Sequence, residues 1–338
     1  MESINTLVTL PFPDPLIEKL ENASPRVTVQ KQVVADEAEL AAAIEETEVL
    51  YASRLLPQPD EAPNLRWVQL HSAGVDHIAD HVLFTDTAIK FTTTSGIHAV
   101  NMAEYAIGQI LAFAHHLPRM LEDQQAAAWP EDRWDRYVPR ELRGATLGIV
   151  GYGSIGREIA RLGTAFGMTV LAVKNNLRQL SDEGKFRLPG TGDPEAELPE
   201  RIYPVQALNS FLGECDFVVL TVPLTESTRH LVDAGALAAM KPGAVLVNVA
   251  RGGVVDERAL AEALSQGKLG GAALDVFEQE PLPEDSPLWK LPNVIISPHV
   301  SGFTPHYDER ATDLFAENLR RYAAGEPLLN EVSRQRGY

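Results

Sequence analysis

A glycine-rich turn between an apolar run and a helix-like segment constrains the fold of this chain more than any other stretch. Residues 146–150 predict a buried strand, and Gly151, Gly153 and Gly156 follow in the spacing Gly-x-Gly-x-x-Gly. The first glycine allows a tight turn, the second lets a pyrophosphate approach the backbone, and the third lets a helix pack against the sheet. Unpaired N–H groups at the start of that helix would hold the phosphates. An ordinary tight loop can carry the same glycines, but the flanking strand and helix favour a dinucleotide site.

The overall composition narrows the classes of partner. The chain has 338 residues, 45% of them hydrophobic, which predicts about two domains and a sizeable core. Its formal net charge of −18 argues against nucleic acid or an anionic membrane as a partner. An anionic substrate would therefore need positive charge concentrated at its own site.

The single cysteine and the first residues bear on the location of the protein. Cys215 lies in a mostly apolar run and is expected in the core, and with one cysteine no intrachain disulfide can form. This fits a reducing compartment, so we expect a cytoplasmic protein. The first residues lack the basic start and long apolar run of a secretory signal. No apolar run reaches the roughly 18 residues needed to span a membrane.

Strand-like and helix-like segments alternate along the chain, which predicts α/β folds with parallel sheets and ligands at the carboxyl ends of the strands. Before the glycine turn, strands are predicted over residues 6–10, 27–30, 49–52, 65–70 and 89–93, and helices over 15–22 and 36–46. After it, strands are predicted over 169–173, 216–220, 245–249, 272–275 and 294–297, and helices over 207–212, 257–264 and 308–322. A long helix is predicted from about residue 100 to 121, bent or ended by Pro118.

The segment after this helix, residues 122–144, is irregular and rich in charged and aromatic residues. Trp129 and Trp134 both lie in it, and two exposed tryptophans in one surface loop would be unusual. We therefore expect this arm to pack on a partner subunit, with packing inside the chain as the alternative.

The end of the second strand of the nucleotide fold indicates which cofactor is preferred. In folds that bind NAD, an acidic residue about 20 positions past the glycines contacts the adenine-ribose hydroxyls. No acid stands there in this chain, whose residues are Lys174, Asn175, Asn176, Leu177 and Arg178. Lysine, amide and arginine side chains could hold a 2′-phosphate, which a carboxylate would repel. We expect NADP to be preferred; the alternative is a solvated loop that binds the ribose of either NADP or NAD weakly.

Residues 178–200 form a long loop that is rich in glycine and proline. Long loops in compact domains are usually functional or mobile. This loop could cover the 2′-phosphate or contribute to a subunit contact, and our default expectation is a tolerated insertion.

Six segments of the chain resemble those of one known family. They cover residues 71–76, 147–156, 221–228, 249–256, 273–281 and 297–302. They look like the catalytic and cofactor-binding segments of the D-isomer-specific 2-hydroxyacid dehydrogenases. The resemblance runs nearly from end to end, and six segments in order are far more specific than the glycine turn alone.

The resemblance implies a catalytic triad, and the chemistry agrees. Reduction of a 2-oxo acid needs a hydride donor, a proton donor to the carbonyl oxygen, and a cation for the carboxylate. His299 is the expected proton donor, because imidazole gains and loses a proton near neutral pH. Glu280 is expected to bind the other ring nitrogen of that histidine, and Arg251 to offer a planar fork to the carboxylate. Singly, each residue type is more often structural, so the prediction depends on their joint occurrence.

The resemblance also implies the remaining contacts. Backbone N–H groups around Ala73 and Gly74 are expected to bind the substrate carboxylate, and Asp275 to contact the nicotinamide amide. The expected cofactor-binding residues, with Asp275, are Gly151, Gly153, Ser154, Ile155, Gly156, Lys174, Asn175, Asn176, Arg178, Thr221, Val222, Pro223, Thr228, Val249, Ala250, His299, Ser301 and Gly302.

Other polar residues near these segments have weaker assignments. His98, Asn101 and Met102 are candidates for lining a substrate cleft. His77 and His81 are four residues apart, but no third ligand accompanies them, so no metal site is expected.

The fold that the resemblance implies has two Rossmann-like or flavodoxin-like α/β domains with a cleft between them. The cofactor domain, residues 100–301, would be inserted into a substrate domain made of residues 1–99 and 302–338. The two crossings would form a hinge. Members of the family are commonly dimers through the cofactor domain, which agrees with the prediction for the arm.

The leading function is therefore an oxidoreductase that transfers a hydride between NAD(P)H and a 2-oxo acid or D-2-hydroxy acid. A glyoxylate/hydroxypyruvate reductase and a phosphoglycerate dehydrogenase are alternatives, although the lack of a C-terminal regulatory domain argues against the regulated form of the latter. Glu280 argues against a formate dehydrogenase, which has glutamine there. A nucleotide-sensing, co-repressor-like binding protein is the non-enzymatic alternative, which the lack of basic or repeat tails disfavours. The side chain of the substrate stays open.

Overall fold

The computed structural model describes residues 3–85 and 88–334, which form two compact units. The first unit contains the described residues up to Ile97, residues 183–188, and those from Thr304 onward; the second contains residues 98–182 and 189–303. Each unit has its own parallel sheet, which confirms the prediction of two α/β domains. Residues 183–188 pack with the first unit, although they lie within the range predicted for the cofactor domain. Among the described residues, no helix is both long and apolar enough to cross a membrane.

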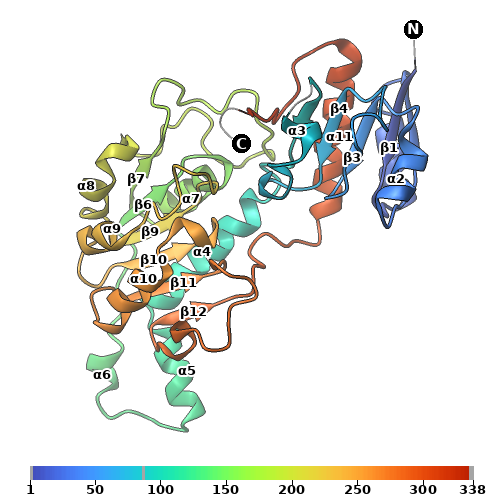
Figure 1. The fold of residues 1–338 in the computed structure, drawn as a ribbon. Helices are drawn as coiled ribbons and strands as arrows, with labels where there is room; N and C mark the ends of the chain where they lie inside the picture. The colour runs from blue at the N-terminus through green and yellow to red at the C-terminus, as the bar shows by residue number, and fades with distance from the viewer. Residues whose placement is uncertain (1–2, 86–87, 335–338) are drawn as a thin grey trace. The chain divides into compact units, whose positions relative to one another are not determined.

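The first unit is a five-stranded parallel sheet covered by helices on both faces (Figure 1). Its strands occur in the order β2-β1-β3-β4-β5. Their bounds are β1 (Ile4–Val8), β2 (Val27–Lys31), β3 (Val49–Ala52), β4 (Trp67–Leu70) and β5 (Lys90–Thr92). Its helices are α1 (Asp14–Glu21), α2 (Glu37–Ile44), α3 (Val82–Thr85) and α11 (Tyr307–Ala324).

Alternating side chains along these strands explain the two covered faces. Leu50 belongs to the core under α2 and α3, whereas the next residue, Tyr51, belongs to the core under α1 and α11. Successive residues of a strand point to opposite faces of the sheet, so β3 is apolar throughout because both faces are buried.

The second unit is a seven-stranded parallel sheet in the order β12-β11-β10-β9-β6-β7-β8. The strands are β6 (Thr146–Val150), β7 (Thr169–Val173), β8 (Arg201–Tyr203), β9 (Phe217–Leu220), β10 (Val245–Asn248), β11 (Gly271–Leu274) and β12 (Val294–Ile296). From β6 the chain adds strands first on one side and then on the other, which is the order of a dinucleotide-binding fold. Within the described residues, β8 is the strand that the sequence did not predict; its three residues come directly after the loop rich in glycine and proline.

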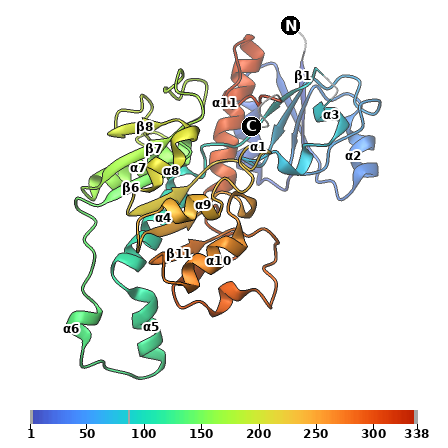
Figure 2. The same ribbon diagram turned by 60° about the vertical axis from the view of Figure 1, so that its left-hand side comes forward.

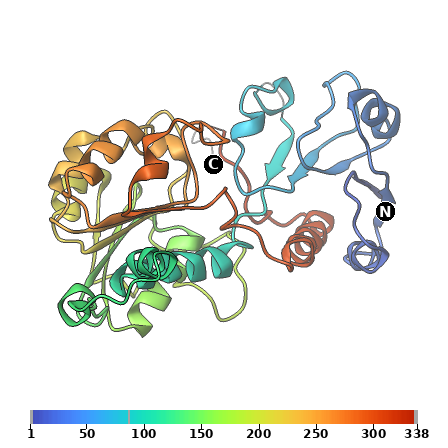
Figure 3. The ribbon, with the colours of Figure 1, turned by 90° about the horizontal axis from the view of Figure 1, so that it is seen from below.

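Helices cover both faces of this second sheet (Figure 3). On one face α4 (Ala99–Ala114) and α7 (Ser154–Ala165) share a core with the sheet. On the other face α8 (Leu208–Leu212), α9 (Ala234–Ala239) and α10 (Glu257–Ser265) do so. Cys215 is buried, as predicted, in the core between the sheet and helices α8, α9 and α10. Burial raises the pKa of its thiol to about 12.

The long helix predicted from residue 100 to 121 is two helices in the structure. The first, α4, ends at Ala114, and α5 (Leu117–Gln125) begins after His116, whose φ of 57° lies in the left-handed region. Pro118 stands in the first turn of α5, where its missing N–H would be unpaired in any case. The chain then continues through α6 (Arg133–Arg136), and Figure 2 shows α5 and α6 projecting from the rest of the second unit.

Candidate active site

The predicted catalytic and cofactor residues of the second unit gather at one edge of its sheet. The glycine turn follows β6, Thr221 follows β9, Arg251 follows β10 and His299 follows β12. Because the strands are parallel, their carboxyl ends meet at the same edge. The strand order reverses between β6 and β9, which is where ligands bind in open sheets of this kind.

The glycine turn has the geometry of a phosphate cradle. Gly151 has φ of +103°, and a Cβ on Gly156 would lie 2.3 Å from the Gly151 carbonyl oxygen. Gly153 is the N-cap of the twelve-residue helix α7, and a Cβ there would meet no atom within 4 Å. A bare backbone that faces open space at a helix N-terminus suits a pyrophosphate. The residues present therefore fit an NAD(P) cofactor.

The segment after β7 carries the side chains expected near a 2′-phosphate. The Nζ of Lys174 donates to the backbone oxygen of Tyr152, 3.2 Å away, within the glycine turn itself. The Oδ1 of Asn176 accepts from the backbone N–H of Arg178 at 3.0 Å, which makes an Asx turn. Asn175, Asn176 and Arg178 are exposed. The arrangement is cationic and open to a ligand.

His299 and Glu280 form a hydrogen-bonded pair. The Nδ1 of His299 lies 2.8 Å from Oε2 of Glu280, and the other carboxylate oxygen accepts from the backbone N–H of Phe277 at 3.0 Å. The Phe277 N–H group thus fixes the Glu280 carboxylate, and this carboxylate orients the imidazole of His299. Both side chains are partly exposed, and with Nδ1 engaged the Nε2 atom remains for a reacting group.

Asp275 fixes the loop that carries His299, a role that the sequence did not reveal. It is fully buried, and its carboxylate accepts from the Ser297 hydroxyl at 2.6 Å and from the backbone N–H groups of Val300 and Ser301 at 2.9 Å. Its backbone oxygen accepts from the N–H of His299, whose φ of 53° is left-handed. A buried carboxylate with three donors is a strong structural anchor. Contact between Asp275 and a nicotinamide amide stays a prediction.

Arg251 is placed beside the Glu280 loop by a glycine. A Cβ on Gly252 would lie 1.8 Å from the carbonyl carbon of Phe277, so the segments after β10 and β11 approach more closely than any other residue would allow. Asn248 holds the turn, because its side chain donates to the Arg251 backbone oxygen and accepts from the Ala250 N–H. The structure thus brings the Arg251 and Glu280 loops together.

The predicted carboxylate-binding loop lies at the carboxyl end of β4 in the first unit. The Ser72 hydroxyl donates to the Gly74 backbone oxygen at 2.8 Å and shapes the loop. Within the described part of the chain, neither the Ala73 nor the Gly74 N–H group has a hydrogen-bond partner. Two such N–H groups suit an anion.

The remaining predicted contact residues order the loops in which they lie. The Thr221 hydroxyl donates to the Gly151 backbone oxygen at 2.6 Å, and the Thr228 hydroxyl donates to the Pro223 oxygen at 2.7 Å. The other members of the set stand on the same segments, after β6, β9, β10 and β12: Ser154, Ile155, Val222, Val249, Ala250, Ser301 and Gly302.

The candidates for lining a cleft have structural roles. Met102 belongs to the core shared by α4 and α7. Asn101 donates from its side chain to the backbone oxygens of Ser301 and Phe303, and so ties the segment after β12 to α4. His98 is buried at the N-cap of α4.

The two histidines considered as metal ligands contact the backbone instead. His77 lies 3.1 Å from the Ser53 oxygen through its Nε2, and His81 accepts from the Leu83 N–H. Among the described residues, no group of three or more His, Cys, Asp or Glu could hold a metal ion.

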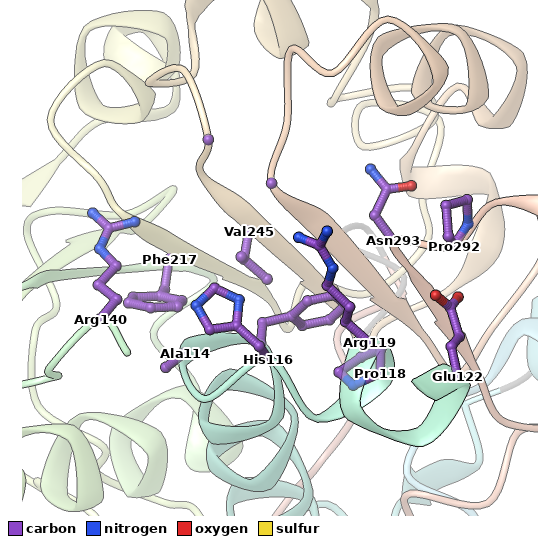
Figure 4. Close-up of a pocket in the computed structure, with 13 residues that line it drawn as sticks. Ala114, His116, Pro118, Arg119, Glu122, Arg140, Phe217, Val245, Pro292 and Asn293 are labelled. Carbon is purple, nitrogen blue, oxygen red and sulfur yellow. The ribbon is translucent and has the colours of Figure 1, made fainter. Parts of the chain in front are cut away.

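A cavity of about 540 Å³ lies at the opposite, amino edge of the second sheet (Figure 4). Phe217 and Val245, the first residues of β9 and β10, belong to its lining. His116 and Arg119, which precede the arm, and Arg140, which lies in the arm after α6, also line it. None of the predicted site residues lines it, so this cavity is distinct from the catalytic edge.

Comparisons with known proteins agree with this geometry. Residues 107–301 match the family model for the NAD-binding domain of D-isomer-specific 2-hydroxyacid dehydrogenases. A glyoxylate reductase of Korarchaeum cryptofilum is 37% identical over 280 residues, which cover 82% of this chain and 78% of that protein. An (S)-sulfolactate dehydrogenase of Chromohalobacter salexigens is 39% identical over 263 residues, covering 77% and 78%.

A solved structure extends the match over nearly the whole chain. It is a D-isomer-specific 2-hydroxyacid dehydrogenase from Xanthobacter autotrophicus in complex with NADPH and MES. The TM-score is 0.79 at 30% identity, with 99% of this chain and all of that one covered. Together with the pair His299–Glu280 at the carboxyl edge of a dinucleotide-binding sheet, these findings show that the chain belongs to the D-isomer-specific 2-hydroxyacid dehydrogenases and is an NAD(P)-dependent oxidoreductase of 2-oxo and 2-hydroxy acids.

Proposed function

We propose that this enzyme works as a 2-oxoacid reductase that prefers NADPH and forms the D-2-hydroxy acid. The observation that carries the catalytic part is the His299–Glu280 pair, 2.8 Å apart and partly exposed at the edge where the glycine turn also stands. When bound there, the nicotinamide cofactor supplies the hydride.

In this proposal the chain itself moves one proton and holds one carboxylate. His299 donates its Nε2 proton to the carbonyl oxygen of the substrate, and Glu280 stabilises the charged imidazolium before that transfer. Arg251 binds the substrate carboxylate, with the N–H groups of Ala73 and Gly74 as further donors. These groups concentrate positive charge locally in a protein with a net charge of −18.

The preference for NADPH is supported by the segment after β7. It offers Lys174 and Arg178 with no carboxylate among residues 174–178, so nothing there would repel a 2′-phosphate. Initial rates with NADH and NADPH test this: kcat/KM should be higher with NADPH. A lower KM for NADH with equal or higher turnover would overturn the preference and leave the reductase assignment intact.

The substrate is to be identified with a panel of 2-oxo acids, from small to branched to aromatic, with each cofactor. Glyoxylate and hydroxypyruvate reduction are the first alternatives to test, and one of the relatives is named a glyoxylate reductase. Oxidation of 3-phosphoglycerate is the other alternative within the family. If no 2-oxo acid supports NADPH oxidation while the cofactor still binds, a nucleotide-sensing role becomes the better interpretation.

We also propose a homodimer formed through the arm. None of the residues of α5 is buried, and Trp129 and Trp134 are 83% and 77% exposed. Large apolar side chains exposed together indicate a protein interface, and the cavity of Figure 4 lies beside the start of the arm. Sedimentation velocity should give the mass of a dimer, and a monomer at micromolar concentration would overturn this proposal. A cytoplasmic location, expected from the single cysteine, stays a prediction.

A further inference from the structure

The long loop 178–200 folds back onto the glycine turn through a buried aspartate. Asp193 is only 6% exposed. Its Oδ2 accepts from the Tyr152 hydroxyl at 2.6 Å and from the Leu198 N–H at 3.0 Å, and its Oδ1 accepts from the Glu197 N–H at 3.0 Å. The carboxylate therefore has three donors, one of which comes from the cofactor turn.

A buried arginine from the glycine helix completes the contact. Arg157 is 1% exposed and donates to the backbone oxygens of Asp193 and Leu180. Its guanidinium lies over the Tyr152 ring, 4.9 Å from the ring centroid, and its Nε is 3.8 Å from Asp182. Burial of an arginine is costly unless it is paired, so a loop that was only a tolerated insertion would not need this arrangement.

A second side chain of the same helix holds the loop independently. The carboxylate of Glu158, also 1% exposed, accepts from the Gly192 N–H at 2.6 Å and is paired with Arg161. Two successive residues of α7, Arg157 and Glu158, thus bind the loop at or directly beside Asp193.

Tyr152 connects this network to the cofactor site. It stands between Gly151 and Gly153, and its side chain is buried. Burial and the adjacent Asp193 carboxylate raise the pKa of its hydroxyl, which keeps it a donor. The backbone oxygen of the same residue accepts from Lys174, the side chain expected at the 2′-phosphate.

We propose that Asp193 is a positioning residue for the cofactor, which fixes the glycine turn and Lys174 through Tyr152. The part that concerns the 2′-phosphate rests on the proposed use of NADPH. Loop 178–200 then supports the nucleotide site by fixing the glycine turn, rather than being the tolerated insertion that we expected.

The test is Asp193→Asn, measured by NADPH and NADH affinity in fluorescence titrations and by steady-state kinetics. The amide keeps the shape but loses the charge, and it turns an N–H₂ group toward a donor. The Kd for NADPH should rise about tenfold or more, because a charge-assisted hydrogen bond is lost. At saturating cofactor, kcat and the KM for the 2-oxo acid should stay within about twofold. NADH affinity should fall less, since Lys174 does not contact a 2′-phosphate there.

Two further variants separate positioning from a general effect on folding. Tyr152→Phe removes only the hydroxyl and should weaken NADPH binding several-fold. This variant replaces Asp193→Asn as the test if the latter does not fold. Phe186→Ala is the matched control in the same loop, because its side chain packs on the apolar cluster of Ile97 and Leu314 in the first unit, away from Asp193. It should lower Tm and leave the Kd for NADPH unchanged.

The proposal fails if Asp193→Asn and Tyr152→Phe bind both cofactors as the wild type does, or if Phe186→Ala weakens binding as much as they do. An NADH preference of the wild type would overturn the proposed cofactor instead. In that case a rise in the Kd for NADH in Asp193→Asn would still support the positioning of the turn.

Discussion

The two edges of the sheet in the second unit differ in how their side chains are held. At the carboxyl edge, buried polar groups fix each functional loop: Asp275 anchors the loop of His299, and Asn248 anchors that of Arg251. At the amino edge, the cavity is lined by charged residues such as Arg119 and Arg140 as well as by apolar ones, and the adjacent helix α5 buries none of its residues and exposes Leu117 and Leu121. The functional loops at the first edge are ordered within the chain, whereas the helix beside the second edge exposes apolar side chains.

This difference in order and exposure indicates that the carboxyl edge is suited to catalysis and the amino edge to association. Chemistry on a small molecule needs groups held in place before the substrate arrives, which buried hydrogen bonds provide. Association needs accessible apolar area. Variants at the carboxyl edge should therefore change rate constants, and variants at the arm should change assembly.

Replacement of the proton donor should have the largest effect. His299→Ala should lower kcat by about a thousandfold, the scale expected for loss of a general acid. NADPH affinity, measured by fluorescence titration, should change little, and circular dichroism should show an intact fold. Retention of most of the activity would remove His299 from the mechanism.

Arg251→Lys tests whether a planar fork or a charge alone binds the substrate. We expect the KM for the 2-oxo acid to rise by about ten- to a hundredfold, because a lysine cannot form the two parallel hydrogen bonds. The Kd for NADPH serves as the internal control and should stay near that of the wild type. An unchanged KM would show that Arg251 does not bind the carboxylate.

Glu280→Gln should slow the reaction while leaving the proton donor in place. The carboxylate lies 2.8 Å from Nδ1 of His299 and orients the imidazole ring. An amide can turn either its oxygen or its N–H₂ group toward Nδ1, so the ring is held less well and kcat should fall by about tenfold. The Kd for NADPH is the control and should stay near that of the wild type. A kcat equal to that of the wild type would contradict the role of the pair.

The paired substitutions Trp129→Ser and Trp134→Ser test the amino edge. Both side chains are exposed in the chain, so the fold should survive, and the sedimentation coefficient should drop from that of a dimer to that of a monomer. Exposed Val138→Ser, in the same arm, is a milder comparison and should weaken the dimer less. An unchanged dimer would place the interface elsewhere.

The smallest effect is expected at Cys215, whose thiol should not react with an alkylating reagent in the native protein. Because burial raises the pKa of its thiol to about 12, little thiolate forms at pH 8, and thiolate is the reactive species. Iodoacetamide should leave the native protein unmodified by mass spectrometry, whereas the urea-unfolded chain should take up one label. Rapid labelling of the native protein would show that this core opens readily.

The sequence by itself determined the two α/β units and the glycine turn, because each depends on local patterns. Strands buried on both faces read as apolar runs, and the turn needs glycines at set positions. The prediction that Arg251, Glu280 and His299 share one site came from the resemblance of their segments to one family, since each residue type taken singly is more often structural.

Only the tertiary structure decided which residues hold those groups in place. Asp275 was predicted only as a cofactor contact, and the structure shows in addition that its carboxylate accepts from three donors of the His299 loop. Asp193 binds Tyr152 of the glycine turn, although the two residues are 41 positions apart. No local pattern marks such partners, since a hydrogen bond between distant segments depends on how the chain folds back. Burial likewise depends on packing, and the burial of Asp193 and Arg157 is what distinguishes loop 178–200 from a tolerated insertion.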